Sequence, residues 1–362
     1  MIKLGSICDF QSGGTPSKGK IEYFNGDIPW ITTTSLNGSR IDEKDAVNWI
    51  TEKAIKETAA RIVPANSIMV GTRVGVGKVA INTIDMSTSQ DVISLLNIDE
   101  KKWSKDYLCK FIQGKSAYLN SQARGATIKG IKIDVLANLE VPTIDYKQQQ
   151  FISETIDAVR SIISARRQEL HILDELIRAR FVEMFGDPIS NEKGWRTASL
   201  TDVCSKIFGG GTPSKSHPEY FEGSIPWVSP KDMKAGVITD SIDHITEEAI
   251  HNSTTNLVPK GSVLMVIRSG ILKHDLPVAI NAVPVTINQD MKAFVPSESI
   301  TASFLRNYFK AIEPDVLAGV RGVTADNIDF KSFQQRKIIV PPIYLQITFE
   351  DFCKQVDKSK FA

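Results

Sequence analysis

The feature that most constrains this chain is an internal repeat that covers most of its 362 residues. The segment Gly-Gly-Thr-Pro-Ser-Lys occurs at 13–18 and again at 210–215, a shift of 197 residues. At the same shift, Tyr-Phe-x-Gly-x-Ile-Pro-Trp occurs at 23–30 and 220–227. With small insertions and deletions, the register continues to an Arg-Gly pair late in each copy. Two homologous domains therefore share one chain.

Each copy contains short apolar runs bounded by Gly, Pro and Asn, a pattern that predicts strands and turns. Examples are 67–70 in the first copy and 262–266 in the second. Helical stretches are fewer, and we expect them at 51–60 and 105–120. The predicted fold class is α+β, with two β-rich domains in tandem, a long coiled-coil helix between them and a shorter second helix at the C-terminus.

The amino-acid composition changes between the copies, where residues 146–184 contain neither Gly nor Pro. At about 1.5 Å per residue, a helix of this length spans roughly 55–60 Å. Gly186 and Pro188 then end it. Apolar residues follow alternating steps of four and three, and the predicted coiled-coil seam is Ile152, Ile156, Val159, Ile163, Leu170, Leu173, Ile177 and Met184.

The start of this helix is echoed near the C-terminus, where the Gln-x-x-Phe pattern of 148–151 recurs at 346–349. Phe349, Phe352 and Val356 are predicted to pack on the central helix. The chain ends at Ala362, so we expect a truncated counterpart of the spacer, and an unmated seam favours self-association. The predicted bounds are 1–145 for the first domain, 146–185 for the spacer helix, 186–344 for the second domain and 345–362 for the C-terminal helix.

Composition excludes several classes of protein. No apolar run approaches the roughly 18 residues of a membrane span, and the N-terminus has no signal-peptide core, so we expect a cytoplasmic protein. The four cysteines are far apart without a CxxC spacing, which argues for buried free thiols and against a zinc or redox site. A net charge of +1 means that DNA affinity would depend on local patches or on partners.

Motifs for chemistry in the chain itself are incomplete. Residues 14–20 resemble a phosphate-binding loop, but Ile21 replaces the Ser or Thr that ligates magnesium, and the second copy lacks the motif. Gly75 and Gly77 are followed by a strand-like run rather than a helix, which indicates a turn. The sequence has neither the Asn-Pro-Pro-aromatic motif of adenine methyltransferases nor a convincing nuclease set. We therefore expect a non-catalytic chain without a metal site.

The tandem motifs, together with a Gln-x-x-Phe helix start that follows a Pro in each copy, resemble those of the DNA-specificity subunits of type I restriction-modification systems, over nearly the whole chain. The resemblance implies that each domain is a target-recognition domain for one half of a split double-stranded DNA site. It also implies that the helices space the halves and dock two modification subunits, which methylate adenine with S-adenosylmethionine. A restriction, or translocase, subunit could join them. No cofactor is expected in this chain.

Residues that repeat in both copies serve folding or the contacts to phosphates that carry no sequence information. Gly-rich turns favour the second role, because Gly permits close backbone approach. The predicted phosphate or backbone contacts are Thr15, Ser17, Lys18, Arg73, Lys78, Arg124, Thr127 and Lys129 in the first copy, and Thr212, Ser214, Lys215, Lys273, Arg268, Arg321 and Thr324 in the second.

Base reading is expected where the copies diverge, because two different half-sites need different donors and acceptors. Ordinary loop drift explains such divergence almost as well. Trp30 and Trp227 repeat beside apolar residues and are interpreted as core rather than as stacking platforms. The predicted base-reading residues follow these tryptophans and are Thr32, Thr33, Thr34, Ser35 and Asn37, and Ser229, Lys231, Asp232 and Lys234.

Two functions compete at this point. The favoured one is a DNA-binding scaffold that reads an asymmetric split site and positions modification subunits on it. The alternative is an interaction or decoy protein that binds modification subunits, or dimerises, without normal DNA targeting. An autonomous enzyme is a third class, for which the sequence offers no motif.

Overall fold

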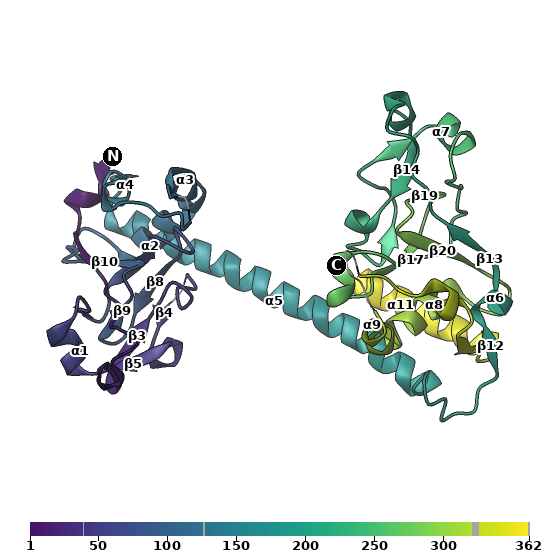
Figure 1. The fold of residues 1–362 in the computed structure, drawn as a ribbon, viewed down its shortest axis with the longest axis horizontal. Coiled ribbons are helices and arrows are strands. Elements are labelled where there is room, and N and C mark those ends of the chain that lie inside the picture. The colour runs from purple at the N-terminus through teal and green to yellow at the C-terminus, as the bar shows by residue number, and fades with distance from the viewer. Residues whose placement is uncertain (39, 126, 321–325, 361–362) are drawn as a thin grey trace. The chain divides into compact units, whose positions relative to one another are not determined.

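The computed structural model describes residues 1–38, 40–125, 127–320 and 326–360. The chain forms two compact units, residues 1–165 (unit 1) and 166–362 (unit 2). Each unit contains one copy of the repeat and part of the long helix α5 (Tyr146–Phe185). The predicted α+β class, the tandem domains and the two helices are confirmed (Figure 1).

Unit 1 is built on a five-stranded sheet and a four-stranded sheet. In the first sheet only β4 (Arg40–Ile41) and β8 (Val79–Asn82) pair in parallel, and in the second only β3 (Phe24–Ile31) and β9 (Met86–Thr88). A further pair joins β1 (Ile2–Lys3) and β11 (Glu140–Val141). In spatial order the strands of the first sheet are β2 (Asp9–Ser12), β10 (Val92–Leu96), β7 (Ile68–Gly71), β8 (Val79–Asn82) and β4 (Arg40–Ile41), and those of the second are β5 (Asn48–Ile50), β3 (Phe24–Ile31), β9 (Met86–Thr88) and β6 (Ile62–Val63).

Unit 2 repeats this plan with a five-stranded sheet, a three-stranded sheet and the pair of β12 (Thr197–Ser199) with β21 (Lys337–Ile339). The larger sheet again has one parallel pair, β15 with β18. In spatial order its strands are β13 (Cys204–Gly209), β20 (Met291–Pro296), β17 (Val263–Val266), β18 (Val278–Asn281) and β15 (Val237–Ile238), and the smaller sheet has β16 (His244–Ile245), β14 (Ile225–Val228) and β19 (Thr286–Ile287).

The helices are short apart from α5 and α11. The stretch 105–120, predicted as one helix, is two helices, because Lys115 leaves helical geometry after Gly114. Ile312 makes the same break in the second copy, so the break belongs to the shared fold. The helices are α1 (Glu52–Glu57), α2 (Lys105–Gly114), α3 (Ser116–Gln122), α4 (Ile133–Ala137), α6 (Leu200–Val203), α7 (Glu247–His251), α8 (Ala302–Ala311), α9 (Glu313–Ala318), α10 (Phe330–Gln334) and α11 (Ile343–Lys360).

The central strand β7 is apolar and buried on both faces, as expected for a strand inside a layered core. Ile68 and Val70 pack in one cluster with Leu108 and Ile112 of α2. Met69, between them in sequence, points to the other face and joins a second cluster. The sheet is thus covered by α2 on one side and by the smaller sheet's core on the other.

A buried glutamine ties each long helix to its domain. Gln149 of α5 accepts a hydrogen bond from the Ser104 amide (2.9 Å) and donates to the carbonyls of Lys102 and Ile144. Gln346 of α11 repeats these bonds with the amide of Thr301. Gln149 is therefore the structural counterpart of Gln346, one residue later than the Gln148 that the sequence pattern aligned with it.

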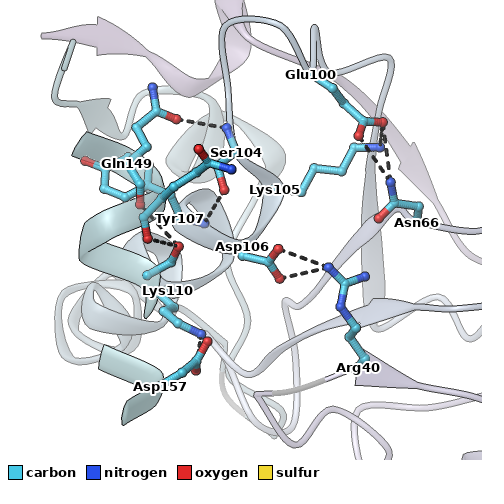
Figure 2. Close-up of polar contacts among 12 residues, drawn as sticks. Arg40, Asn66, Glu100, Ser104, Lys105, Asp106, Tyr107, Lys110, Gln149 and Asp157 are labelled. Carbon is cyan, nitrogen blue, oxygen red and sulfur yellow. Dashed lines mark hydrogen bonds and ion pairs between the residues drawn. The ribbon is translucent and has the colours of Figure 1, made fainter. Parts of the chain in front are cut away.

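Charged side chains extend the junction of α2 with α5 and with β4 (Figure 2). Lys110 of α2 forms an ion pair with Asp157 of α5. Asp106, one turn earlier on α2, accepts two hydrogen bonds from Arg40 of β4 at 3.0 Å. Helix α2 therefore joins the edge of the sheet to the first part of the spacer helix.

The predicted coiled-coil seam behaves differently in the two units. In unit 2, Ile177 and Phe349 are buried in one apolar cluster. The ring centroid of Phe349 lies 5.6 Å from that of Phe181 and 5.5 Å from that of Phe185. This confirms that the C-terminal helix packs on the second part of α5. In unit 1, Val159 and Ile163 are 49% and 46% exposed, and among the described residues of this unit there is no helix as long as α11 to cover them.

All four cysteines are buried and free, as the sequence predicted. Burial raises the pKa of the Cys8 and Cys204 thiols to about 12. It raises the pKa of Cys109 and Cys353 to about 11. No helix in the described part of the chain is long and apolar enough to cross a membrane.

We expect Phe349→Ala to destabilise unit 2 by about 3–5 kcal/mol, the usual cost of emptying a buried phenylalanine site. Urea denaturation would show it as a lower midpoint. Phe151→Ala is the matched control, because Phe151 is 70% exposed and should change the stability by less than about 0.5 kcal/mol. Equal effects of the two substitutions would contradict the packing of α11 on α5.

Candidate nucleic-acid interface

The repeated Gly-Gly-Thr-Pro loop is anchored in the same way in both copies. The indole of Trp30 donates a hydrogen bond to the Gly14 carbonyl at 3.0 Å. Trp227 does the same to Gly211, also at 3.0 Å. A Cβ on Gly14 would lie 2.3 Å from the Ala59 backbone, so only glycine fits there. Trp30 is buried and Trp227 half-buried, which supports their interpretation as packing residues.

The next residue of the loop reaches a second repeated segment. The Thr15 hydroxyl donates to the side-chain oxygen of Gln90. Thr212 and Gln289 form the equivalent hydrogen bond. The threonines predicted to contact phosphate thus already hold the Gln-Asp turn in place.

The aspartate of that turn faces the predicted arginine in each copy. Asp91 lies 3.9 Å from Arg73, and Asp290 lies 2.6 Å from Arg268. The arginine side chains remain 56% and 49% exposed, whereas the aspartates are 27% and 24% exposed. A half-buried carboxylate therefore orients an exposed guanidinium, whose five N–H donors exceed what one carboxylate can use.

In unit 1, Gly130 and Ile131 join Arg124 to the connection between β7 and β8. Arg124 and Gly130 exchange backbone hydrogen bonds at 2.9 Å, and the Ile131 amide donates to the Thr72 carbonyl. Gly130 also forms an antiparallel β-bridge with Arg73. A Cβ on Gly130 would lie 2.7 Å from the Arg73 side chain. The fold therefore unites Arg73 and Arg124, which are far apart in sequence.

Two hollows lie where these segments meet, and Ile128 lines both. One, of about 330 Å³, includes Thr127 and Lys129 in its lining. The other, of about 400 Å³, includes Arg73 and Arg124. Within the described ranges, Lys78, Arg124, Lys129 and Lys132 form no ion pair, and Asp134 is the acidic residue in the lining of the second hollow. The surface around Ile128 is therefore positively charged.

Unit 2 repeats the closure as far as it is described. The Ser269 amide donates to the Asp326 carbonyl at 3.1 Å, and Ile328 donates to Ile267 at 2.9 Å. Arg268 forms an antiparallel β-bridge with Asn327. Lys273 lies 3.8 Å from Asp326. The predicted contacts Arg321 and Thr324 lie outside the described residues.

The remaining predicted phosphate contacts are on the outer part of the Gly-Gly loops. They are exposed, and within the ranges that the structure describes none of them hydrogen-bonds to the arginine connections. These residues are Ser17, Lys18, Ser214 and Lys215.

Several predicted base-reading residues face the interior. Thr33, Ser35 and Ser229 are buried. The Ser35 hydroxyl donates to the Asp45 carbonyl at 2.7 Å, and Ser229 forms a capping box with Asp232. These hydroxyls hold the loops together in this structure.

Other members of the predicted base-reading set remain at the surface. Thr34, Asn37, Lys231 and Lys234 are exposed, although Lys231 pairs with Asp243 at 2.6 Å. Thr32 is half-buried, and its hydroxyl lies 2.8 Å from that of Thr34. Base reading by the exposed members stays a prediction.

Sequence reasoning missed three exposed aliphatic residues beside the cations, Val74, Ile128 and Ile271. Apolar residues in turns are common, so none of them stood out singly. For Val74 and Ile271, the signal that could have found them is their position between cations in the corresponding connections of the two copies.

A protein family matches both copies. Its description is "Type I restriction modification DNA specificity domain", and it matches residues 1–171 and 192–362. The chain belongs to this family. It contains two DNA specificity domains, one in each copy of the repeat.

Two curated specificity subunits are similar in sequence. The subunit of the type I restriction enzyme EcoR124I/EcoR124II of Escherichia coli is 36% identical over 197 residues, which is 54% of this chain and 46% of that protein. The chain thus spans under half the length of that relative. The MjaIX specificity subunit of Methanocaldococcus jannaschii is 27% identical, over 94% of this chain and 82% of that protein.

Solved structures share the fold of these domains. The type I restriction-modification S subunit of M. genitalium has a TM-score of 0.57 at 15% identity, covering 99% of this chain and 91% of its own. A chain from a structure on complex assembly and conformational transition of the type I R-M system has a TM-score of 0.58 at 16% identity, covering 99% and 90%.

We expect Arg124→Gln combined with Lys129→Gln to weaken binding of duplex DNA similarly for all sequences. The logarithm of the DNA-binding constant falls linearly with the logarithm of the salt concentration. Each lost phosphate contact should make this slope less steep by about 0.9. Titrations at several salt concentrations would measure the slope. Lys56→Gln is the control, because Lys56 is an exposed lysine of α1 paired with Glu52. A slope unchanged by the double substitution would exclude these cations from the interface.

Proposed function

We propose that this chain is the DNA-recognition subunit of a type I restriction-modification complex and reads an asymmetric split site. The observation that carries the proposal is the repeated arrangement of threonine, glutamine, aspartate and arginine beside connections that differ between the copies. Repeated phosphate-binding residues combined with different loops suit two domains that bind DNA duplexes of the same form but different sequence.

The copies differ in the connections beside the arginines. Residues 72–78 join β7 to β8 through a tight turn, with positive φ at Gly75 and Gly77. Residues 267–277 join β17 to β18 and contain a 3₁₀ helix, Gly270–Lys273. The two domains thus carry different loops on the same fold, which supports the proposal that they read different half-sites.

The helices supply spacing and partner docking in this proposal. Forty residues of α5 correspond to about 60 Å, more than one turn of duplex DNA at roughly 34–36 Å. Exposed aliphatic residues such as Val159, Ile162 and Ile163 suit two modification subunits, to which we assign adenine methylation and the S-adenosylmethionine. Restriction or translocase subunits would join this assembly in the cytoplasm.

The overall charge agrees with shared binding. A net charge of +1 leaves few phosphate contacts beyond the local clusters, so partners would contribute much of the electrostatic attraction. We therefore assign sequence selection to this chain and much of the affinity to the assembled complex.

Methylome sequencing tests the proposal directly. A host that expresses this chain with its modification subunit should gain a split adenine-methylated motif with two unlike halves, and a host with the modification subunit alone should not. A stable complex without new methylation would contradict DNA targeting and favour the decoy function.

The spacer role predicts a change in the site when α5 is lengthened. A tandem repeat of residues 159–165 adds seven residues, or about 10.5 Å, so the gap should grow by roughly three base pairs at 3.4 Å each. Selection of binding sites from random DNA would show it. Gln168→Ala, which keeps the length of the helix, is the control. An unchanged gap in the lengthened chain would remove the ruler function.

A further inference from the structure

The connections between the central strands of the two large sheets share a chemical pattern. In unit 1, Val74 is 59% exposed and lies between Arg73 and Lys78 in the connection 72–78. In unit 2, Ile271 is 40% exposed and lies between Arg268 and Lys273. Each domain therefore presents a branched aliphatic side chain between cations.

Local structure holds both side chains outward. In unit 2, Leu272 is buried, and the Ser269 hydroxyl accepts a hydrogen bond from the Ile271 amide at the start of the 3₁₀ helix. In unit 1, Val74 has φ +34°, which is unfavourable for a β-branched residue. The Gly77 amide donates to Gly71 at 2.9 Å and closes this turn. Strained positions of this kind persist where the surroundings fix them, and they concentrate at functional sites.

Unit 1 adds a second aliphatic residue at the same place. Ile128 is 57% exposed and lines the first hollow together with Val74. Arg73 and Arg124 line the second hollow, and Ile128 lines both. Two apolar groups thus lie within a basic surface.

This combination limits the ligand. A purely apolar partner would leave the cations desolvated without counter-charges, and a bare phosphate would gain nothing from the aliphatic groups. The major groove of DNA combines phosphates at its edges with one apolar group on its floor, the C5-methyl of thymine. The surface matches that combination.

We propose that Val74 and Ile128 in unit 1 and Ile271 in unit 2 contact thymine methyl groups, and that they are specificity-determining residues. The inference rests on the proposed function and deepens it by naming the base group that is read. The neighbouring arginines position the duplex, while the aliphatic side chains favour thymine at the facing position.

Deoxyuridine provides the probe, because uracil differs from thymine only by lacking the methyl group. After the bound site has been defined with the assembled complex, each thymine of each half-site is replaced singly by deoxyuridine. We expect at least one position in each half-site to bind about fourfold more weakly, the fold-change that corresponds to burying one methyl-sized group.

The variants assign the contacts. Ile271→Ala should abolish the sensitivity to deoxyuridine in one half-site only, and Val74→Ala or Ile128→Ala should abolish it in the other. Ile21→Ala is the control, because Ile21 is 78% exposed and lies outside these connections. It should leave both sensitivities unchanged.

Two results would overturn the inference alone: specific binding indifferent to every deoxyuridine, or sensitivity that persists in all three variants. Failure of the unaltered complex to bind any duplex specifically would instead contradict the proposed function, and with it this inference.

Discussion

The buried glutamine at the start of each long helix is the interaction on which the rest of the architecture depends. Gln149 and Gln346 are fully buried, and each satisfies one amide and two carbonyl groups of the backbone. Loss of such a side chain would leave several buried polar groups unpaired, each at a cost of about 1–3 kcal/mol. The same bonds in both copies mean that each recognition domain joins its helix in one fixed way.

The two junctions differ in what covers the helix beyond this point. In unit 2, Phe349 of α11 packs with Phe181 and Phe185, so two helices and the domain share one core. In unit 1, the first part of α5 is held by α2 through Lys110 and Asp157, while Val159 and Ile163 stay exposed. An aliphatic face next to a fixed domain suits the docking of modification subunits that we propose.

Much of this architecture could be predicted from the sequence, because a repeat and a helix without Gly or Pro are signals that do not need tertiary information. The tandem domains, the long helix and the packing of Phe349 follow from periodicity and register. The hydrogen bonds of Thr15 with Gln90 and of Trp30 with Gly14 could not be predicted. They join residues 75 and 16 positions apart, which the folded sheets bring together.

The candidate site shows the same limit more clearly. The repeat in the sequence identified Arg73 and Arg124, but only the backbone pairing of Gly130 with both of them shows that they share a surface. Divergence pointed to Ser35 and Ser229, which the fold uses internally. A sequence does not state which face of a loop is turned to solvent, and side-chain direction decides between reading DNA and holding the loop.

A chain in which the second domain, residues 186–344, replaces the first, residues 1–145, tests most directly whether each copy reads its own half-site. The account predicts that the assembled complex then methylates a site whose two halves are identical and match one half of the original motif. Retention of the original asymmetric motif would contradict the account, because recognition would then not reside in the two repeated domains.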